Sequence, residues 1–146
     1  MDSNHRYVEE IIKQFNHLKV QRRKAATHQK VGRGAGFVLT YLYNQDENVI
    51  PSEIGRQMNV STPRVTAILN KLEAKNLIIR TISPEDRRNV FITLSEQGRQ
   101  IVEEKKAQQE KNIQTLVERL KSDDLEAFIR VLKEIDTIIE QQGWGF

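Results

Sequence analysis

The hydrophobic pattern of this chain changes its period at about residue 77, and that change constrains the fold more than any other feature. Before it, apolar residues recur at helical spacing, as they do on one face of an α-helix. From Leu77 to Leu94, two short segments are rich in β-branched residues and are typical of strands. Helical spacing returns after residue 95. The pattern predicts a mainly α-helical protein with one small β-hairpin.

Two short helices joined by a tight turn are predicted just before the hairpin. Pro51 suits the first turn of a helix, where its missing N–H costs no hydrogen bond, and this helix is expected to end at Met58. Asn59 tolerates the left-handed conformation that a tight turn requires. Ser61 is suited to cap a second helix that runs to about Lys75. The segment is therefore a predicted helix-turn-helix.

The predicted hairpin carries a basic tip. Its strands are expected at Leu77–Ile82 and Asn89–Leu94, and the turn between them holds Asp86, Arg87 and Arg88. A helix-turn-helix followed by a basic hairpin is the winged helix-turn-helix pattern. Its second helix fits the major groove of B-DNA and presents N-terminal side chains to base edges. A basic wing suits the minor groove, where negative potential is concentrated.

The candidate DNA contacts follow from this pattern. Arg64 can donate two hydrogen bonds to a guanine, although contact with a phosphate, or with solvent alone, remains an open alternative at this stage. The predicted contacts are Ser61, Thr62, Pro63, Arg64, Thr66, Asn70 and Lys71 on the second helix, and Arg87 and Arg88 on the wing.

Charge is unevenly distributed along the chain, although the net charge is only +3. Residues 11–45 carry seven basic side chains and no acidic one, and residues 51–90 carry seven basic and four acidic. Residues 91–146 carry eight basic and eleven acidic side chains, a net of −3. Such a chain can turn a positive face toward a polyanion, although a solvated surface of uneven charge gives the same pattern.

The two ends of the chain are predicted to form amphipathic helices. A first helix at Tyr7–Arg22 and a last helix capped by Ser122–Asp124 each carry an apolar stripe. One chain has difficulty burying all of these faces, and packing across a two-fold axis buries them. We therefore expect a homodimer, with residues 1–30 and 95–146 forming a helical dimerisation region and residues 31–94 forming the winged helix-turn-helix lobe.

The composition restricts the cellular setting. The chain has no cysteine, which excludes disulfides and thiolate metal sites and fits a reducing cytoplasm. No apolar run is long enough to span a membrane, and the polar N-terminus does not resemble a signal peptide. We expect a cytoplasmic protein with no membrane partner.

No catalytic or metal-binding constellation stands out. The histidines His5, His17 and His28 supply neither a nucleophile–base pair nor convergent metal ligands. The glycine-rich segment 32–36 lacks the features of nucleotide-binding loops and is predicted to start a helix. We therefore expect no enzyme activity, no metal and no cofactor. The competing hypothesis to a regulator is a helical interaction module that keeps the winged fold without specific DNA binding.

The wing region resembles the signature of the MarR family of bacterial transcriptional regulators. The segment Asp86–Gly98 has an Asp-x-Arg tip, a short apolar strand, a Leu-Ser pair and a following glycine, and the order of helices is similar over nearly the whole chain. The resemblance implies an obligate homodimer that binds a pseudo-palindromic operator near a promoter, usually as a repressor. It also implies that Asp86 pairs with Arg88 and orients that arginine in the wing.

The same resemblance implies a small-molecule effector, anionic or aromatic, that lowers DNA affinity. In the family, such ligands bind between the dimerisation helices and the DNA-binding lobe. The competing interpretation is core packing of the aromatic side chains, with solvation or phosphate contact for the arginines. The residues at the corresponding sequence positions are Arg22, Arg23, Phe37, Tyr41 and Tyr43.

Overall fold

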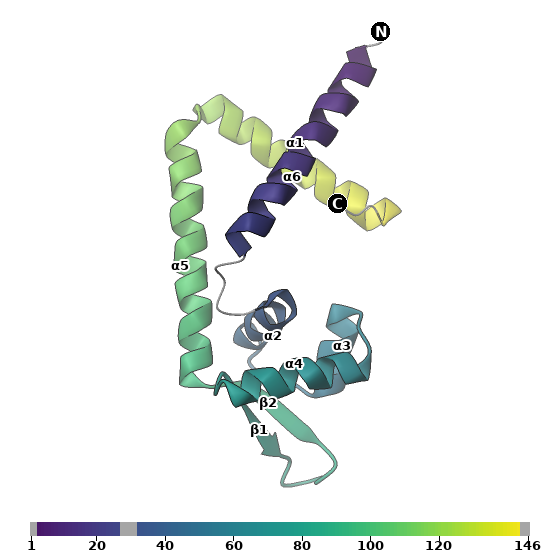
Figure 1. Ribbon diagram of the computed structural model, residues 1–146, viewed down its shortest axis with the longest axis vertical. Helices are drawn as coiled ribbons and strands as arrows, with labels where there is room; N and C mark the ends of the chain where they lie inside the picture. The colour runs from purple at the N-terminus through teal and green to yellow at the C-terminus, as the bar shows by residue number, and fades with distance from the viewer. Residues whose placement is uncertain (1–2, 27–31, 144–146) are drawn as a thin grey trace. The chain divides into compact units, whose positions relative to one another are not determined.

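The protein is mainly helical, with one two-stranded hairpin, as predicted from the sequence. The computed structural model describes residues 3–26 and 32–143, and the chain divides into two compact units, Met1–Leu94 and Ser95–Phe146 (Figure 1). The first unit contains α1 (Ser3–Ala26), α2 (Arg33–Tyr43), α3 (Pro51–Met58), α4 (Thr62–Ala74), β1 (Ile78–Ile82) and β2 (Val90–Leu94), and the second contains α5 (Glu96–Arg119) and α6 (Ser122–Gln142).

The predicted elements are present, with differences at their ends. The first helix extends beyond both ends of the predicted Tyr7–Arg22 segment. The predicted cap of the last helix is wrong: Lys121 occupies the N-cap position and makes no side-chain cap hydrogen bond. Asp123 and Asp124 lie within the first turn instead. There, their carboxylates interact favourably with the positive end of the helix dipole, but these residues do not occupy the cap position of α6.

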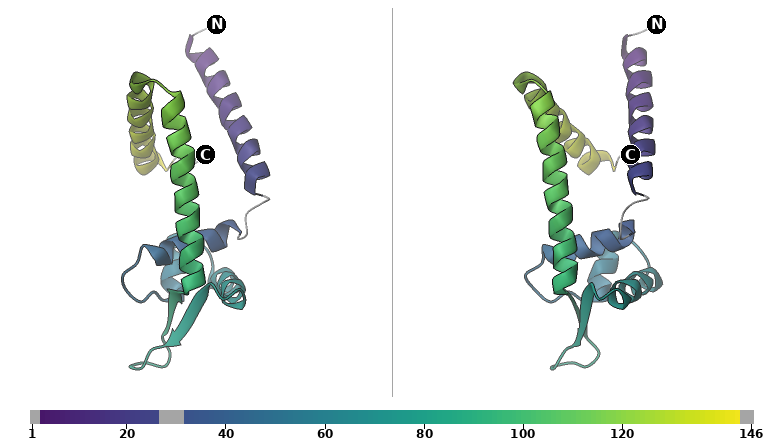
Figure 2. Two further views of the ribbon diagram at one scale, coloured as in Figure 1. Left: turned by 90° about the vertical axis from the view of Figure 1, so that its left-hand side faces the viewer. Right: turned by 60° about the vertical axis from the view of Figure 1, so that its left-hand side comes forward.

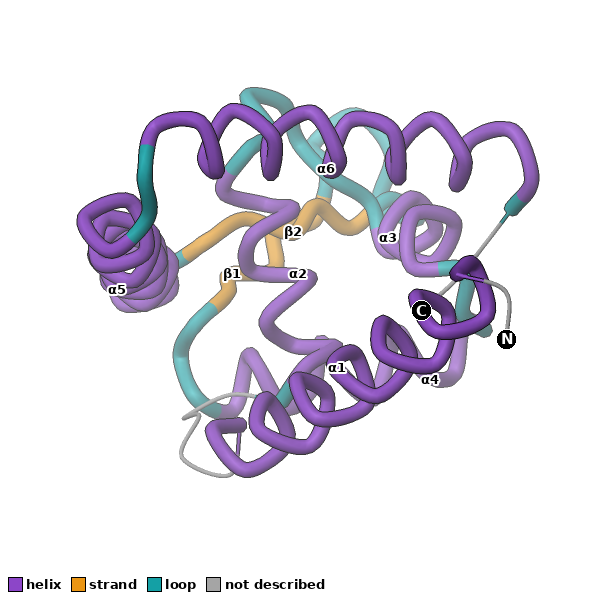
Figure 3. Tube along the Cα trace, turned by 90° about the horizontal axis from the view of Figure 1, so that it is seen from above, coloured by secondary structure: helices purple, strands orange, loops and turns teal. Residues whose placement is uncertain are grey.

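The hairpin is antiparallel and is joined by a third extended stretch. Its register pairs Ile78 with Leu94 and Ile82 with Val90. The Ile92 N–H donates a 2.8 Å hydrogen bond to the carbonyl of Val49, which precedes α3. The hairpin projects away from α2, α3 and α4, so that its turn forms a free tip (Figure 2). Within the described residues, strands occur only in this hairpin (Figure 3).

The core of the first unit lies where α2, α3, α4 and the hairpin meet. Gly34, at the start of α2, allows this helix to approach α4 closely, because a Cβ at that position would lie 3.0 Å from Cδ1 of Ile68. This agrees with the prediction that the glycine-rich segment starts a helix. The buried apolar side chains of the lobe are Val38, Leu39, Leu42, Val49, Ile54, Val65, Leu69, Leu72, Leu77, Ile78 and Ile92.

The second unit consists of two long helices. Ser95 caps α5 as predicted, and its Oγ accepts a 3.0 Å hydrogen bond from the Gly98 N–H. Phe128 and Leu132, one helical turn apart on α6, remain 45% and 48% exposed. The apolar stripe predicted for the last helix is thus present, and part of it lies uncovered within a single chain.

We predict that Ile92→Ala lowers the free energy of unfolding by about 2–5 kcal/mol, because it leaves a cavity in the core. Ile92 is 1% exposed, whereas Ile79 in the same hairpin is 51% exposed. The matched control Ile79→Ala is expected to change the free energy of unfolding by about 1 kcal/mol or less, because it replaces an exposed strand-favouring residue with one that favours strands less. Denaturant unfolding at one fixed protein concentration measures both. Equal losses for the two variants would contradict this placement of the core.

Candidate nucleic-acid interface

The outward face of α4 is the first part of the candidate interface. Val65, Leu69 and Leu72 are each 1% exposed and anchor the opposite face of this helix in the core. Because an α-helix has a period of 3.6 residues, the positions on the side of α4 opposite these three face solvent. All seven side chains predicted to contact DNA from this segment are exposed: Ser61, Thr62, Pro63, Arg64, Thr66, Asn70 and Lys71.

The turn before α4 sets the position of its N-terminus. Asn59 has a left-handed backbone, with φ of 52° and ψ of 48°, as predicted. The Val60 N–H then donates a 3.1 Å hydrogen bond to the Gly55 carbonyl and closes the turn. Ser61 occupies the N-cap position as predicted, but its side chain makes no cap hydrogen bond. The geometry of the turn therefore depends on backbone hydrogen bonds and on Asn59.

One flank of α4 is cationic. Arg64, Lys71 and Lys75 line a surface hollow of about 470 Å³, together with Gly32 and other residues at the start of α2. The three side chains recur at intervals that place them on one side of the helix. This flank adds positive potential beside the exposed face that carries the predicted base contacts.

The other flank of α4 contacts the hairpin through Arg80 of β1. The Arg80 Nη2 donates a 2.8 Å hydrogen bond to Oδ1 of Asn70, and Nη1 lies 3.0 Å from Oε2 of Glu73. One guanidinium thus bridges two positions of α4, a two-pronged geometry that a lysine could not reproduce. The sequence did not predict this contact, because it depends on the register of the strand against the helix.

The hairpin tip is held by a buried serine. Ser83 is 4% exposed, and its Oγ accepts hydrogen bonds of 3.3 Å from the N–H groups of Glu85 and Asp86. The Asn89 N–H donates to the Asp86 carbonyl at 2.9 Å and closes the turn. The sequence predicts a turn between the two strands but does not single out Ser83, whose position before a proline is typical of such side-chain-stabilised turns.

Asp86 and Arg88 lie together at the tip, as the family resemblance implies. Oδ1 of Asp86 accepts a 3.0 Å hydrogen bond from the Arg88 backbone N–H and lies 3.7 Å from Nε of Arg88. The Arg88 side chain is 94% exposed, so the ion pair itself is worth less than about 1 kcal/mol. The backbone hydrogen bond orders the tip, and both wing arginines point into solvent where a polyanion can reach them.

The aromatic residues of α2 form a cluster beside α3. The rings of Phe37 and Tyr41 stack with centroids 6.2 Å apart. The Tyr41 hydroxyl donates a 2.7 Å hydrogen bond to Oε1 of Glu53 in the first turn of α3. Of the other predicted effector residues, Tyr43 is half-buried and Arg22 is exposed, and the side chain of Arg23 lies outside the described residues.

Comparison with known proteins assigns the chain to a family. The MarR family model matches residues 33–90. YwhA of Bacillus subtilis strain 168, named as an uncharacterized HTH-type transcriptional regulator, is 30% identical over 112 residues, which cover 77% of this chain and 80% of YwhA. The chain belongs to the MarR family. The resemblance found in the wing sequence is confirmed.

Two further proteins show the extent of the MarR likeness. YdgJ of the same organism, also named as an uncharacterized HTH-type transcriptional regulator, is 30% identical over 95 residues; these cover 65% of this chain and 57% of YdgJ, so the match spans little more than half of that relative. The crystal structure of Streptococcus pneumoniae FabT in complex with DNA shares the fold, with a TM-score of 0.75, 21% identity, and coverage of 94% of this chain and 98% of FabT.

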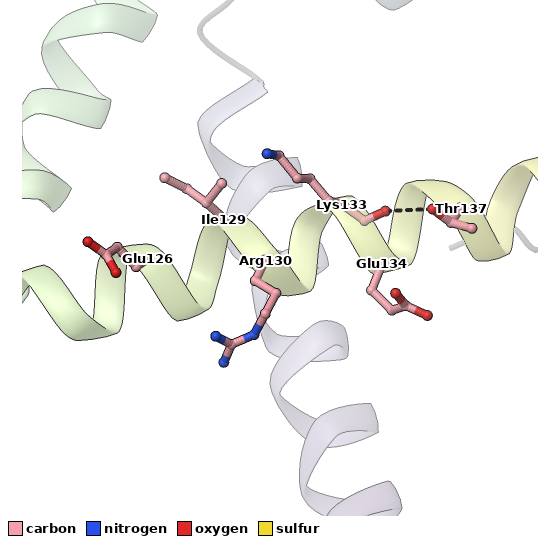
Figure 4. Close-up of a pocket in the computed structure, with 6 residues that line it drawn as sticks. All are labelled: Glu126, Ile129, Arg130, Lys133, Glu134 and Thr137. Atoms are coloured by element: carbon pink, nitrogen blue, oxygen red, sulfur yellow. Dashed lines mark hydrogen bonds between the residues drawn. The ribbon is translucent and has the colours of Figure 1, made fainter.

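A hollow on α6 of this MarR protein lies outside the winged lobe. Its six lining residues, which include Glu126, Arg130 and Glu134, all lie on α6 (Figure 4). Thr137 donates a 3.0 Å hydrogen bond to the Lys133 carbonyl within the same helix. Because the side chains belong to one helix and spread along it, they do not converge on a common point as catalytic groups do.

Two kinds of feature are absent from the described residues. Within residues 3–26 and 32–143, no helix is both long and apolar enough to cross a bilayer. Over the same ranges, His, Asp and Glu side chains nowhere gather in a group of three or more that could hold a metal ion.

We predict that Glu53→Gln lowers the pKa of the Tyr41 hydroxyl toward its ordinary value of about 10. The pKa is raised chiefly because the hydroxyl donates to Glu53, with smaller contributions from burial and from the Glu53 charge. Since the folded state holds this proton more tightly, the contact stabilises the fold below about pH 10 and is lost as the pH rises through the raised pKa.

Tyrosinate absorbance measures this shift. The chain has three tyrosines, so the titration of Tyr41 is isolated as the difference between each protein and its Tyr41→Phe partner, in the native and in the Glu53→Gln background. A Tyr41 titration that is identical in the two backgrounds would show that the hydrogen bond to Glu53 is absent in solution.

Proposed function

We propose that the protein is a cytoplasmic, sequence-specific, double-stranded DNA-binding transcriptional regulator, and that it acts as a ligand-responsive repressor on a pseudo-palindromic operator. The observation that carries this proposal is that one lobe presents both the exposed face of α4 and the cationic hairpin tip. Membership of the MarR family supports it, and so does the complex of FabT, a protein of the same fold, with DNA. We assign no catalytic role to the chain.

The two surfaces suit different parts of the duplex. Thr62, Arg64 and Thr66 lie in the N-terminal half of α4, the part of a recognition helix that reaches base edges in the major groove. Arg87 and Arg88 lie in the turn between β1 and β2 and suit the narrow minor groove next to the contacted major groove. Base contacts from α4 supply specificity, and the wing and the cationic flank supply affinity.

We propose that the regulator is a homodimer. Large apolar side chains are more than one third exposed on α1, α5 and α6, among them Ile11, Ile113 and Leu132. Apolar side chains that remain exposed along the faces of long helices normally mark an interface. Residues 1–30 and 95–146 would then form the dimerisation region and residues 31–94 the DNA-binding lobe. A two-fold axis would present two recognition helices to half-sites about one helical turn apart.

An anionic or aromatic effector is the remaining part of the proposal. Phe37 is 42% exposed although it stacks on Tyr41, so an aromatic face is available on α2. The Tyr41 hydroxyl already donates to Glu53, and the ring rather than the hydroxyl would meet a ligand. Arg22, Arg23 and Tyr43 remain proposed members of this site.

Selection of random duplex DNA by the purified full-length protein, at two salt concentrations, tests the function. We expect enrichment of an inverted repeat with half-sites about one helical turn apart. We also expect affinity to fall steeply as salt rises, because bound phosphates release counterions. Failure to enrich any motif, with only weak salt-dependent binding, would contradict a sequence-specific regulator and favour an interaction module.

The double variant Arg87→Ala/Arg88→Ala tests the wing. We expect weaker binding to operator and to related sequences alike, with the slope of log affinity against log salt reduced in magnitude by about 4, because a homodimer loses four arginines. Sedimentation should show an unchanged oligomeric state. The matched control Arg119→Ala/Arg130→Ala removes two arginines from the second unit and should leave DNA affinity nearly unchanged. Native affinity in the wing variant would refute the wing assignment.

A further inference from the structure

The polarity of the Asn70 side chain is determined by its contact with Arg80. An asparagine amide has one acceptor, Oδ1, and one donor group, Nδ2. A guanidinium has donors only, so the Asn70 atom that faces Arg80 must be the carbonyl oxygen. The contact is a 2.8 Å hydrogen bond from Nη2 of Arg80 to Oδ1 of Asn70. One lone pair of Oδ1 is therefore engaged within the protein, whereas the Asn70 amino group can donate to an external partner.

The same arginine is itself held in place. Its Nη1 lies 3.0 Å from Oε2 of Glu73, one turn further along α4, and the Arg80 side chain is only 29% exposed. With both ends of the guanidinium engaged, rotation of the guanidinium away from Asn70 must break two contacts. The ion pair between Arg80 and Glu73 also neutralises the Glu73 carboxylate, which lies on the recognition helix and would otherwise repel phosphate.

Asn70 occupies a position from which it can reach DNA. It is exposed and lies one helical turn beyond Thr66, on the side of α4 opposite the buried Leu69 and Leu72. A free asparagine reads adenine with both of its groups, because Oδ1 accepts from N6 while Nδ2 donates to N7. Because Oδ1 already accepts from a cation, its remaining lone pair is a weaker acceptor for N6, and the two-bond reading of adenine is disfavoured for Asn70.

We propose that Arg80 is a positioning residue for base specificity, which orients Asn70 to read bases mainly as a donor. Asn70 then favours guanine, whose N7 and O6 are both acceptors in the major groove, over adenine, which sets the N6 donor beside its N7 acceptor, and over cytosine, which presents the N4 donor. This inference rests on the proposed function and adds to it the chemical class of base edge that the C-terminal half of α4 recognises.

Selection with variants tests the proposal. The wild type and Asn70→Ala are compared first, and the operator position whose preference is lost in Asn70→Ala is the one that Asn70 reads. Arg80→Met frees Oδ1 while keeping a long side-chain stem. At the Asn70 position, the preference of this variant is expected to shift toward adenine by about 5-fold or more, the lower end of what a bidentate contact discriminates.

Charge effects are separated by a second comparison. Glu73→Gln leaves the Arg80 hydrogen bond to Asn70 intact, so it should keep the wild-type base preference while changing overall affinity. Arg80→Met/Glu73→Gln has the wild-type net charge and should keep the shift toward adenine. If circular dichroism shows that Arg80→Met does not fold, Arg80→Thr takes its place in the selection. Threonine suits a strand, and its side chain is too short to reach Asn70.

The outcomes distinguish this inference from the function on which it rests. If the wild type enriches no motif, the proposed function fails and the inference fails with it. If the wild type enriches a motif but Asn70→Ala leaves every base preference unchanged, Asn70 reads no base and only the inference is overturned. The same holds if Arg80→Met and Arg80→Thr keep the wild-type preference at the Asn70 position.

Discussion

The burial of one face of α4 is the interaction on which the rest of the lobe depends. Val65, Leu69 and Leu72 are almost completely buried, and their removal from water fixes the rotation of the helix about its own axis. Once that rotation is set, the side chains on the opposite side of the helix face outward. Core packing thus determines the recognition surface, because that surface consists of the helix positions that the core does not bury.

Local signals in the sequence were sufficient to place most of the fold. Helical spacing located the helices, and the run of β-branched residues after Ala74 located the hairpin. Asn59 and Ser95 were identified correctly because each acts within its own turn, through a backbone conformation or a short hydrogen bond. The cap of α6 was placed wrongly, since three polar residues in a row, Ser122 to Asp124, suit both a cap and a first turn.

Contacts between elements could not be predicted in the same way. The bridge from Arg80 to Asn70 requires the strand register, the rotation of α4 and a particular arginine rotamer at once. The bond from Tyr41 to Glu53 likewise joins residues of two helices. Neither pair has a characteristic spacing in the sequence. Asn70 was therefore predicted as a simple DNA contact, whereas the structure engages its carbonyl within the protein and leaves its amino group available.

The hydrogen bond between Tyr41 and Glu53 joins α2 to the first turn of α3. Glu53 lies in the first turn of α3, where the helix dipole favours a negative charge, so the carboxylate serves two elements at once. The phenol of Tyr41 and the carboxylate of Glu53 therefore hold each other in position across two helices. Any ligand that displaced the Tyr41 ring would have to break this hydrogen bond at the start of the helix-turn-helix.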